Sequence, residues 1–324
     1  MVSTPVSSPT VLAGGSMLES ASKSCSHASP MVRTVLSFQR AKEKQRKIVS
    51  LTCYDYTTAR LLDEEGDIDL LLVGDSLAMT VLGHPDTLRV TMDEMLHHVK
   101  AVSRGTKHAL VLADMPFLSY QVEHTEAIRN AGRFMQEGGA KAVKLEGASA
   151  PILRLVEHLT AIGIPVVGHL GFTPQSVHTL GGYKVQGKGV SAARQLIEDA
   201  LQLQKAGIFA LVLEMVPVEV AAFISRLLTI PVIGIGAGQG CDGQVLVIDD
   251  LLGRYSEITP RFVRRYMQSA PMIRTAVKAF ADDIQTGNFP VDAIEAFPVP
   301  ESEHVELAAL FATFTKSTTH NEKS

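Results

Sequence analysis

Acidic, basic and imidazole side chains recur at one kind of position, directly after short apolar runs of the sequence. They are Asp75 with the neighbouring Ser76, Asp114, Lys144 and Glu146, His169, and Glu214. Each has an ordinary alternative: a carboxylate can cap a helix, and a histidine on an apolar strand most often belongs to the core. The acids together would repel one another unless a cation or a bound ligand compensated their charges. Oxygen ligands without nearby Cys or paired His suit Mg²⁺ better than zinc, and Lys144 suits a substrate carboxylate.

The intervening sequence predicts the elements that position these side chains. Apolar runs typical of buried strands cover 48–53, 70–73, 109–113, 142–145, 165–168, 210–213, 231–235 and 244–248. They alternate with amphipathic stretches typical of helices at 57–65, 92–104, 125–136, 151–161, 192–206 and 218–228. This alternation predicts parallel strands in an α/β fold, and eight of them favour a closed (β/α)₈ TIM barrel over an open sheet. The last strand is the weakest prediction, because its sequence also suits a helix, and 261–280 is expected to form a final outer helix.

A closed barrel would gather the chemical side chains at one edge. Active sites of such barrels lie at the carboxyl ends of the strands, where every residue named above is expected. Because side chains alternate along a strand, Lys144 and Glu146 should point the same way, toward the barrel axis. The pattern therefore predicts a metal-assisted site at this edge.

Composition excludes several other classes of function. The chain has 324 residues, a formal net charge of −4, 46% hydrophobic residues and 20% charged residues. This balance gives no support for a nucleic-acid or membrane partner, and no apolar run approaches the roughly 20 residues that span a bilayer. The three cysteines are odd in number and far apart, which predicts neither a disulfide framework nor a zinc site, and indicates a reducing compartment.

The two ends of the chain differ from its middle. Residues 1–35 are rich in Ser, Thr, Ala and Pro and contain a single acid, Glu19, so they are expected to be disordered or a transit segment. The scarcity of acids favours a mitochondrial location, whereas the scarcity of Arg leaves plain disorder and a cytoplasmic protein as the alternative. The catalytic barrel is expected over 36–297, and residues 298–324 are expected to form a peripheral tail.

Two glycine-rich stretches remain. The sequence GGYKVQGKG at 181–189 approaches a nucleotide P-loop, but Gly189 stands where that motif needs Ser or Thr. We reject the nucleotide interpretation and expect a mobile lid, with an ordinary crossover loop as the alternative. The second stretch, GIGAGQG at 234–240, lacks the spacing of a dinucleotide fingerprint and instead predicts close backbone approach at the barrel mouth.

Several motifs carry a family resemblance over about residues 35–290. TCYDYTTA, LLLVGDSLAMTVLGH, LADMPF, VKLEG, GHLGFTPQSV, GGYKVQGKG, LVLEMVPVEVA and IPVIGIGAGQGCDGQ occur in this order. The chain thereby resembles the ketopantoate hydroxymethyltransferases, which commit 2-oxoisovalerate to pantothenate synthesis. The resemblance implies a (β/α)₈ barrel, Mg²⁺, 5,10-methylenetetrahydrofolate as co-substrate, and a homo-oligomer, commonly a decamer.

The resemblance also implies roles for individual residues. Asp75, Asp114 and Glu146 would bind the metal, and Glu214 would be the base. The oxoacid would be contacted by Asp75, Ser76, Asp114 and Lys144, with His169 as a further active-site residue. These roles agree with enolate chemistry, in which a Lewis acid stabilises the carbanion formed next to a ketone.

Two other functions remain as alternatives. A Mg²⁺-dependent oxoacid lyase or mutase of the isocitrate lyase and phosphoenolpyruvate mutase type would use a similar site. Such enzymes typically carry a catalytic cysteine in a Lys-Lys-Cys-Gly loop, which this sequence lacks. A non-enzymatic binding barrel is disfavoured, because it would be expected to have lost some of the acids at the edge.

Overall fold

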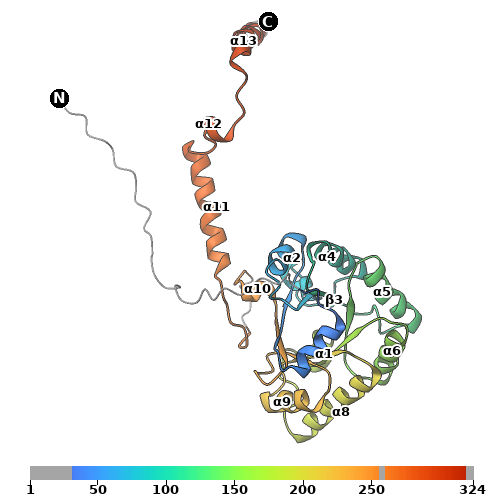
Figure 1. Ribbon diagram of the computed structural model, residues 1–324. Helices are drawn as coiled ribbons and strands as arrows, with labels where there is room; N and C mark the ends of the chain where they lie inside the picture. Colours follow the sequence, from blue (N-terminus) through green and yellow to red (C-terminus); the bar gives the residue numbers. More distant parts are fainter. Residues whose placement is uncertain (1–30, 255–259, 319–324) are drawn as a thin grey trace, which may run out of the picture.

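The strands form a closed parallel barrel. The computed structural model describes residues 31–254 and 260–318, and in it each strand pairs with its sequence neighbours and β1 closes the barrel on β8. The strands are β1 (Ile48–Thr52), β2 (Leu70–Val73), β3 (Leu110–Asp114), β4 (Ala142–Glu146), β5 (Val166–Gly171), β6 (Ala210–Glu214), β7 (Val232–Ile235) and β8 (Gly243–Leu246). The predicted TIM barrel is confirmed (Figure 1).

Helices between the strands surround the barrel in the expected alternation, and further helices precede and follow it. They are α1 (Val35–Glu43), α2 (Tyr56–Asp63), α3 (Leu77–Thr80), α4 (Met92–Gly105), α5 (His124–Gln136), α6 (Ala150–Ala161), α7 (Val177–Leu180), α8 (Val190–Ala206), α9 (Val218–Leu227), α10 (Ile248–Leu251), α11 (Ser269–Thr286), α12 (Asp292–Glu295) and α13 (His304–Thr318), with 3₁₀ turns η1 (Pro174–Ser176) and η2 (Glu301–Glu303). Local sequence sets several of their starts. Asp55 caps α2 through the Thr58 amide, and Thr91 and Glu94 form a capping box at α4.

Two apolar cores hold the barrel together. The larger core lies between the strands and the outer helices and includes the fully buried Phe134, Met95 and Leu203. The smaller one fills the inside of the barrel, as side chains of alternate strand residues point inward. Phe38 of α1 packs against this interior core at the amino-terminal end of the barrel. Its ring contacts that of Phe209 edge-on, with the ring centroids 5.7 Å apart. In Figure 1, α1 accordingly lies across the ring of strands.

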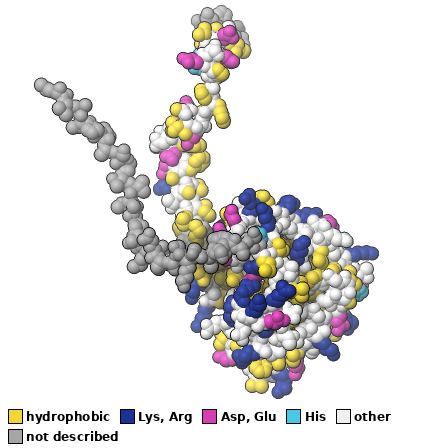
Figure 2. All heavy atoms as spheres, viewed as in Figure 1, with side chains coloured by type: hydrophobic (Ala, Val, Ile, Leu, Met, Phe, Trp, Pro, Cys, Tyr) yellow, Lys and Arg dark blue, Asp and Glu magenta, His cyan; other side chains and the backbone are white. Residues whose placement is uncertain are grey.

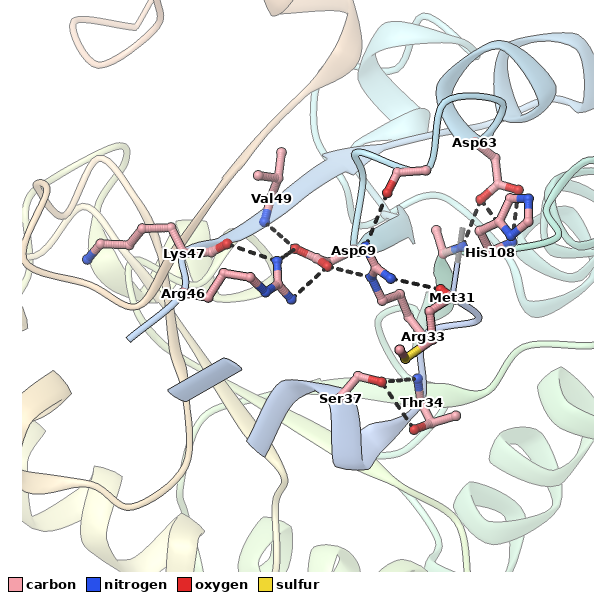
Figure 3. Close-up of polar contacts among 12 residues, drawn as sticks. Met31, Arg33, Thr34, Ser37, Arg46, Lys47, Val49, Asp63, Asp69 and His108 are labelled. Carbon is pink, nitrogen blue, oxygen red and sulfur yellow. Dashed lines mark hydrogen bonds and ion pairs between the residues drawn. The ribbon is translucent and has the colours of Figure 1, made fainter. Parts of the chain in front are cut away.

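A buried carboxylate accepts several hydrogen bonds at the same amino-terminal end of the barrel. Asp69, directly before β2, is 1% exposed, and its oxygens accept hydrogen bonds from Arg33 (2.7 Å) and Arg46 (2.8 and 2.9 Å). The Val49 amide donates a further bond at 3.0 Å, as Figure 3 shows. Burial alone would raise the pKa of Asp69, but these hydrogen bonds outweigh it and hold that pKa below its usual value. The first residues of the described chain are thereby fixed to β1 and β2.

The last part of the chain differs from the sequence prediction. The helix expected at 261–280 begins only at Ser269 and runs to Thr286, because residues 260–268 are held in an irregular turn. There the amides of Tyr266 and Ser269 donate to the carbonyls of Leu251 and Leu252 at the end of α10. Nor does α11 cover the barrel: it leads away from it, followed by α12 and α13 (Figure 1).

This carboxyl-terminal arm, residues 269–318, exposes apolar side chains along its length (Figure 2). Met272, Val277, Phe280 and Ile284 all lie at least half exposed on α11, at spacings that place them along one side of the helix. The expected peripheral position of 298–324 can be followed as far as Thr318, because residues 319–324 lie outside the described part. Residues 1–30, which hold most of the predicted transit segment, also lie outside it. No helix of the described residues is long and apolar enough to span a membrane.

Candidate active site

The chemical side chains predicted from the sequence meet at one cavity of about 780 Å³ at the carboxyl ends of the strands. Its lining includes Asp75, Ser76, Asp114, Lys144, His169 and Glu214. Glu146 does not line the cavity but is buried directly beside it, as its contacts below show. The barrel thus brings together all seven residues named at the outset.

Strand register explains this convergence. Asp114 is level with Lys144 across β3 and β4, Glu146 is level with His169 across β4 and β5, and Glu214 is level with Gly171 of β5. Parallel neighbours at the same level present their side chains at the same height, so charges far apart in sequence become close neighbours.

Several ionisable side chains lie close together in and beside the polar part of the cavity. The Asp75 amide donates to Asp114 Oδ2 at 3.0 Å, and Lys144 Nζ lies 2.9 Å from Asp114 Oδ1. Burial, followed by repulsion from Asp114 and Glu146, raises the pKa of Asp75 well above its ordinary value. Burial likewise raises the pKa of Glu146 to about 7, against the attraction of Lys144. The pKa of Lys144 is raised because the surrounding acids outweigh its burial. The site therefore stabilises additional positive charge.

His169 connects the lysine to the predicted base. Lys144 Nζ lies 3.2 Å from His169 Nδ1, and His169 Nε2 lies 3.4 Å from Glu214 Oε2. Burial and the charge of Lys144 lower the pKa of His169, which favours the neutral ring. An ammonium group can only donate, so Nδ1 is the acceptor and the ring proton sits on Nε2, facing Glu214. His169 therefore lies between Lys144 and Glu214, with its Nε2 facing the Glu214 carboxylate.

The backbone around Glu214 is tightly constrained. Its carbonyl accepts from the Phe172 amide at 2.8 Å, and a Cβ on Gly171 would lie only 2.2 Å from that same oxygen. Gly171 also has φ +94°, so no other residue fits there. The next residue, Met215, adopts φ +50°, an uncommon value for a side chain of this size. Such conformations persist only where the surrounding structure enforces them, which is typical of functional sites.

Two residues that the sequence analysis did not assign complete the site. The Gln175 amide group donates to Asp75 Oδ2 and to the Met115 carbonyl, both at 2.9 Å, while its backbone amide donates to Glu146 Oε2 at 3.1 Å. The Tyr120 hydroxyl donates to Gln175 Oε1 at 2.8 Å and accepts from the Glu146 amide at 3.2 Å. Gln175 thus links two carboxylates of the site. Its motif, GFTPQSV, is part of the family resemblance, but its role depends on the loop after β5 folding back over β2.

The donor chemistry of the site fits Mg²⁺. Among residues 31–254 and 260–318, no group of three or more His, Cys, Asp or Glu side chains is arranged to hold a metal ion, and Lys144 provides the counter-charge in the folded chain. Yet the acids offer only oxygen ligands, and the buried Glu146 Oε1 accepts no hydrogen bond. Hard oxygen donors with an excess of negative charge are what Mg²⁺ prefers.

Sequence comparison decides the family. A family model described as ketopantoate hydroxymethyltransferase matches residues 33–292. The chain belongs to the ketopantoate hydroxymethyltransferase family. A 3-methyl-2-oxobutanoate hydroxymethyltransferase of Acetivibrio thermocellus is 55% identical over 259 residues, covering 80% of this chain and 91% of the relative. One of Syntrophus aciditrophicus is 57% identical over 249 residues, covering 77% and 91%.

Solved structures show how widely the fold is shared. Phosphonopyruvate hydrolase, solved with oxalate and Mg²⁺, aligns with a TM-score of 0.54 over 88% of this chain and 98% of its own, at 14% sequence identity. Phosphoenolpyruvate phosphomutase of Streptomyces platensis aligns with a TM-score of 0.51 over 90% and 99%, also at 14%. At this identity the likeness extends to the fold alone, so these structures do not favour the lyase or mutase alternative for this member of the ketopantoate hydroxymethyltransferase family.

The described cysteines of this family member are unsuited to the nucleophilic chemistry of that alternative. Burial raises the pKa of Cys53 to about 12 and that of Cys241 to about 11, so both thiols stay protonated near neutral pH. Cys25, the remaining cysteine, lies outside the described residues.

Both glycine-rich stretches reach the cavity. Tyr183 and Val185 of the first one line it, and the Tyr183 ring packs 5.0 Å from that of Phe172. Its Gln186 amide donates to the Met215 carbonyl at 2.9 Å, so the loop lies over the rim; its mobility as a lid remains a prediction. In the second stretch, a Cβ on Gly236 would come within 2.7 Å of the Phe262 ring. The expected close approach at the barrel mouth is therefore made by an aromatic side chain.

Proposed function

We propose that the chain transfers a hydroxymethyl group from 5,10-methylenetetrahydrofolate to 3-methyl-2-oxobutanoate, giving 2-dehydropantoate, the first step of pantothenate biosynthesis. The observation that carries the proposal is the convergence of the acids, Lys144 and Glu214 in one buried cavity of a family member. Relatives that are 55–57% identical are named for this activity.

Mg²⁺ would be held by Asp75, Asp114 and Glu146. When bound, it supplies Lewis acidity that makes the hydrogen next to the ketone more acidic. Lys144, which already lies among these acids, would bind the carboxylate of the oxoacid. The Ser76 hydroxyl, fixed by the Tyr54 hydroxyl at 2.9 Å, would donate to the same substrate. These contacts would hold the oxoacid on the polar side of the cavity, which Glu214 also lines.

Glu214 would remove that hydrogen as a proton. Its side chain is 16% exposed, and one carboxylate oxygen lies 3.4 Å from His169 Nε2, which leaves the other oxygen to face the substrate. The glycine-rich loop over the rim would cover the carbanion that results. Water supplies the hydroxyl oxygen: it adds to the methylene carbon as the bonds from that carbon to the two folate nitrogens break, which releases tetrahydrofolate and formaldehyde. The carbanion then adds to the formaldehyde carbon, and the alkoxide takes up a proton to give the hydroxymethyl group.

One assay tests the whole proposal. The full-length protein is incubated with 3-methyl-2-oxobutanoate and either methylenetetrahydrofolate or formaldehyde, with Mg²⁺ or with a chelator. We expect 2-dehydropantoate only when Mg²⁺ is present. Absence of the product with either one-carbon donor in the presence of Mg²⁺ would refute the proposed function.

A proton-exchange experiment tests the base separately. Glu214→Gln should retain oxoacid binding but lose exchange of the C3 proton into deuterated water. The matched control is Glu219→Gln, which removes an exposed carboxylate on nearby α9 and should exchange at the wild-type rate. Wild-type exchange in Glu214→Gln would remove Glu214 as the base.

We also propose a homo-oligomer, as the family resemblance implies. The apolar side of the carboxyl-terminal arm is uncovered, and so is Val49 on the outer face of β1, at 45% exposure. Exposed apolar side chains that gather on one element, as on this arm, are typical of contacts between subunits. Light scattering of the full chain and of a chain ending at residue 268 measures the assembly; a monomeric full chain would contradict it.

The mitochondrial location proposed from the first 35 residues has its own test. The amino terminus of the protein isolated from cells is sequenced. Cleavage near residue 30 supports import into an organelle, and an intact Met1 or Val2 contradicts it.

A further inference from the structure

The cavity is much larger than the oxoacid. It holds about 780 Å³. At roughly 30 Å³ per non-hydrogen atom, the share of one molecule in liquid water, the five-carbon oxoacid would fill only about 240 Å³. The cavity therefore has room for a second and larger molecule beside the oxoacid.

The space is divided by the strand order into a polar and an apolar half. Strands β2 to β5 and the residues that follow them contribute Asp75, Asp114, Lys144 and His169, whereas β7 and β8 contribute Ile235, Val245 and Leu246. Phe262 closes this apolar half from above, where its ring rests on the bare backbone of Gly236. Glu214, at the end of β6, stands between the halves. A large ligand with a flat apolar body fits the β7–β8 side.

One carboxylate stands in the apolar half. Asp250, in α10 after β8, lines the cavity and is partly buried, and its carboxylate accepts no hydrogen bond from the described residues. Burial raises the pKa of Asp250 to about 6; repulsion from Asp249 adds to the effect and Arg265 opposes it. Its oxygens therefore remain open to the cavity, where a ligand could donate hydrogen bonds to them.

We propose that Asp250 binds the aminopyrimidinone edge of the folate co-substrate, with its fused ring packed against the apolar side chains that line the β7–β8 side of the cavity. The inference rests on the proposed function and names the residues that would recognise its co-substrate. That edge presents a ring N–H and an adjacent amino group, two parallel donors that match the two oxygens of a carboxylate. The reduced ring then extends from Asp250 toward Glu214, where the carbanion forms.

The opposite end of the folate is expected at the cavity mouth. Arg261 lines the cavity there and is exposed. Its guanidinium would meet the carboxylates of the glutamate tail, for which planar, bidentate pairing is favourable. The ligand would thus extend from Asp250 to Arg261 along the β7–β8 side of the cavity.

Asp250→Ala and Asp250→Asn test the assignment, with Glu219→Gln as the matched loss of a nearby carboxylate. We expect either Asp250 variant to raise KM for methylenetetrahydrofolate by about 10- to 100-fold, because a charged hydrogen-bonding pair is lost. KM for the oxoacid should change by less than about twofold, and equilibrium binding of tetrahydrofolate should weaken by the same factor as the KM effect. Unchanged folate binding in both variants would overturn the inference.

Two folate-free measurements separate this inference from the proposed function. Exchange of the C3 proton of the oxoacid and product formation from formaldehyde should stay within about twofold of wild type in Asp250→Ala, because neither reaction uses the folate. A parallel loss of both would show that Asp250 acts on the oxoacid site, and would overturn the inference. If the wild type shows no exchange, the proposed function fails, and tetrahydrofolate binding still decides the role of Asp250.

Discussion

Two aspartates bracket the same strand and experience opposite environments. Asp69 precedes β2 at the amino-terminal end of the barrel, and Asp75 follows it at the carboxyl-terminal end. Both are buried, at 1% and 4% exposure. Yet the pKa of Asp69 is lowered and that of Asp75 is raised.

The difference lies in the neighbours. Asp69 faces two arginines and a backbone amide, so its charge is compensated (Figure 3). Asp75 faces the carboxylates of Asp114 and Glu146 and shares a single lysine with them. Asp69, at one end of β2, therefore contributes to stability. At the other end, the acids around Asp75 repel one another, and a bound cation and substrate can reduce this repulsion. Changes at the two ends should separate activity from stability.

The largest effect is expected at the carboxyl-terminal end. Glu146→Gln should reduce product formation by about 10²- to 10³-fold, because a charge that stabilises the reacting complex is lost. The free energy of unfolding of the Glu146→Gln variant, measured in urea, should be unchanged or higher than that of wild type, because one of several mutually repelling carboxylates is gone. A parallel loss of stability and activity would contradict the comparison.

The next effect is expected at the amino-terminal end. Asp69→Asn should lower the free energy of unfolding by about 2–3 kcal/mol, because it leaves Arg33 and Arg46 without their partner. This loss is smaller than that expected for a fully buried ion pair, because the Arg46 side chain is 48% exposed. The kcat of the folded enzyme should not change. Asp67→Asn, at an exposed position two residues earlier, is the control and should affect neither quantity.

A smaller effect is expected from the residue that holds the crowded acids in place. Gln175→Ala should raise the Mg²⁺ concentration for half-maximal activity by about 10- to 100-fold, because supporting contacts orient metal ligands. The Mg²⁺-dependent rise in Tm should shift to higher concentration by the same factor. Gln195→Ala, on the exposed side of α8, should leave both values unchanged. An unaltered Mg²⁺ response would remove Gln175 from the proposed site.

The smallest effect is a pH dependence of the Asp69 contribution. Because the folded pKa of Asp69 lies below its unfolded value of about 3.9, its stabilisation is fully present above that value. It is lost as the pH falls further toward the folded pKa. The stability difference between wild type and Asp69→Asn should therefore be constant from about pH 5 to 8 and shrink below about pH 4. Urea unfolding across this range checks the sign; a difference that grows in acid would contradict it.

Much of the barrel could be predicted from sequence because its strands are short apolar runs that end in polar residues. That pattern located each strand within a few residues and so placed Asp114 and Lys144 at a common edge. The prediction was wrong for the final helix, where 261–280 reads as continuously amphipathic. Backbone hydrogen bonds from Tyr266 and Ser269 to α10 hold that segment in a turn instead, and such long-range contacts leave no local sequence pattern.

Gln175, Tyr120 and Asp250 show what local patterns miss. Gln175 follows Thr-Pro in a loop, and only the folding of that loop over β2 brings its amide group to Asp75. Asp250 stands next to Asp249, and the two look alike in sequence. In the fold Asp249 is ion-paired with Arg254, whereas Asp250 turns to the cavity.

The sequence by itself determined which residue types end the strands, and therefore the barrel and the acids, lysine and histidine of its rim. It could do so because strand period and apolar runs are properties of neighbouring residues. The tertiary structure alone decided which charges are compensated. Asp69 and Asp75 are six residues apart and chemically identical. Only the chain segments packed around each one make the first a structural ion pair and the second part of the candidate active site, because pairing and burial are set by residues distant in sequence.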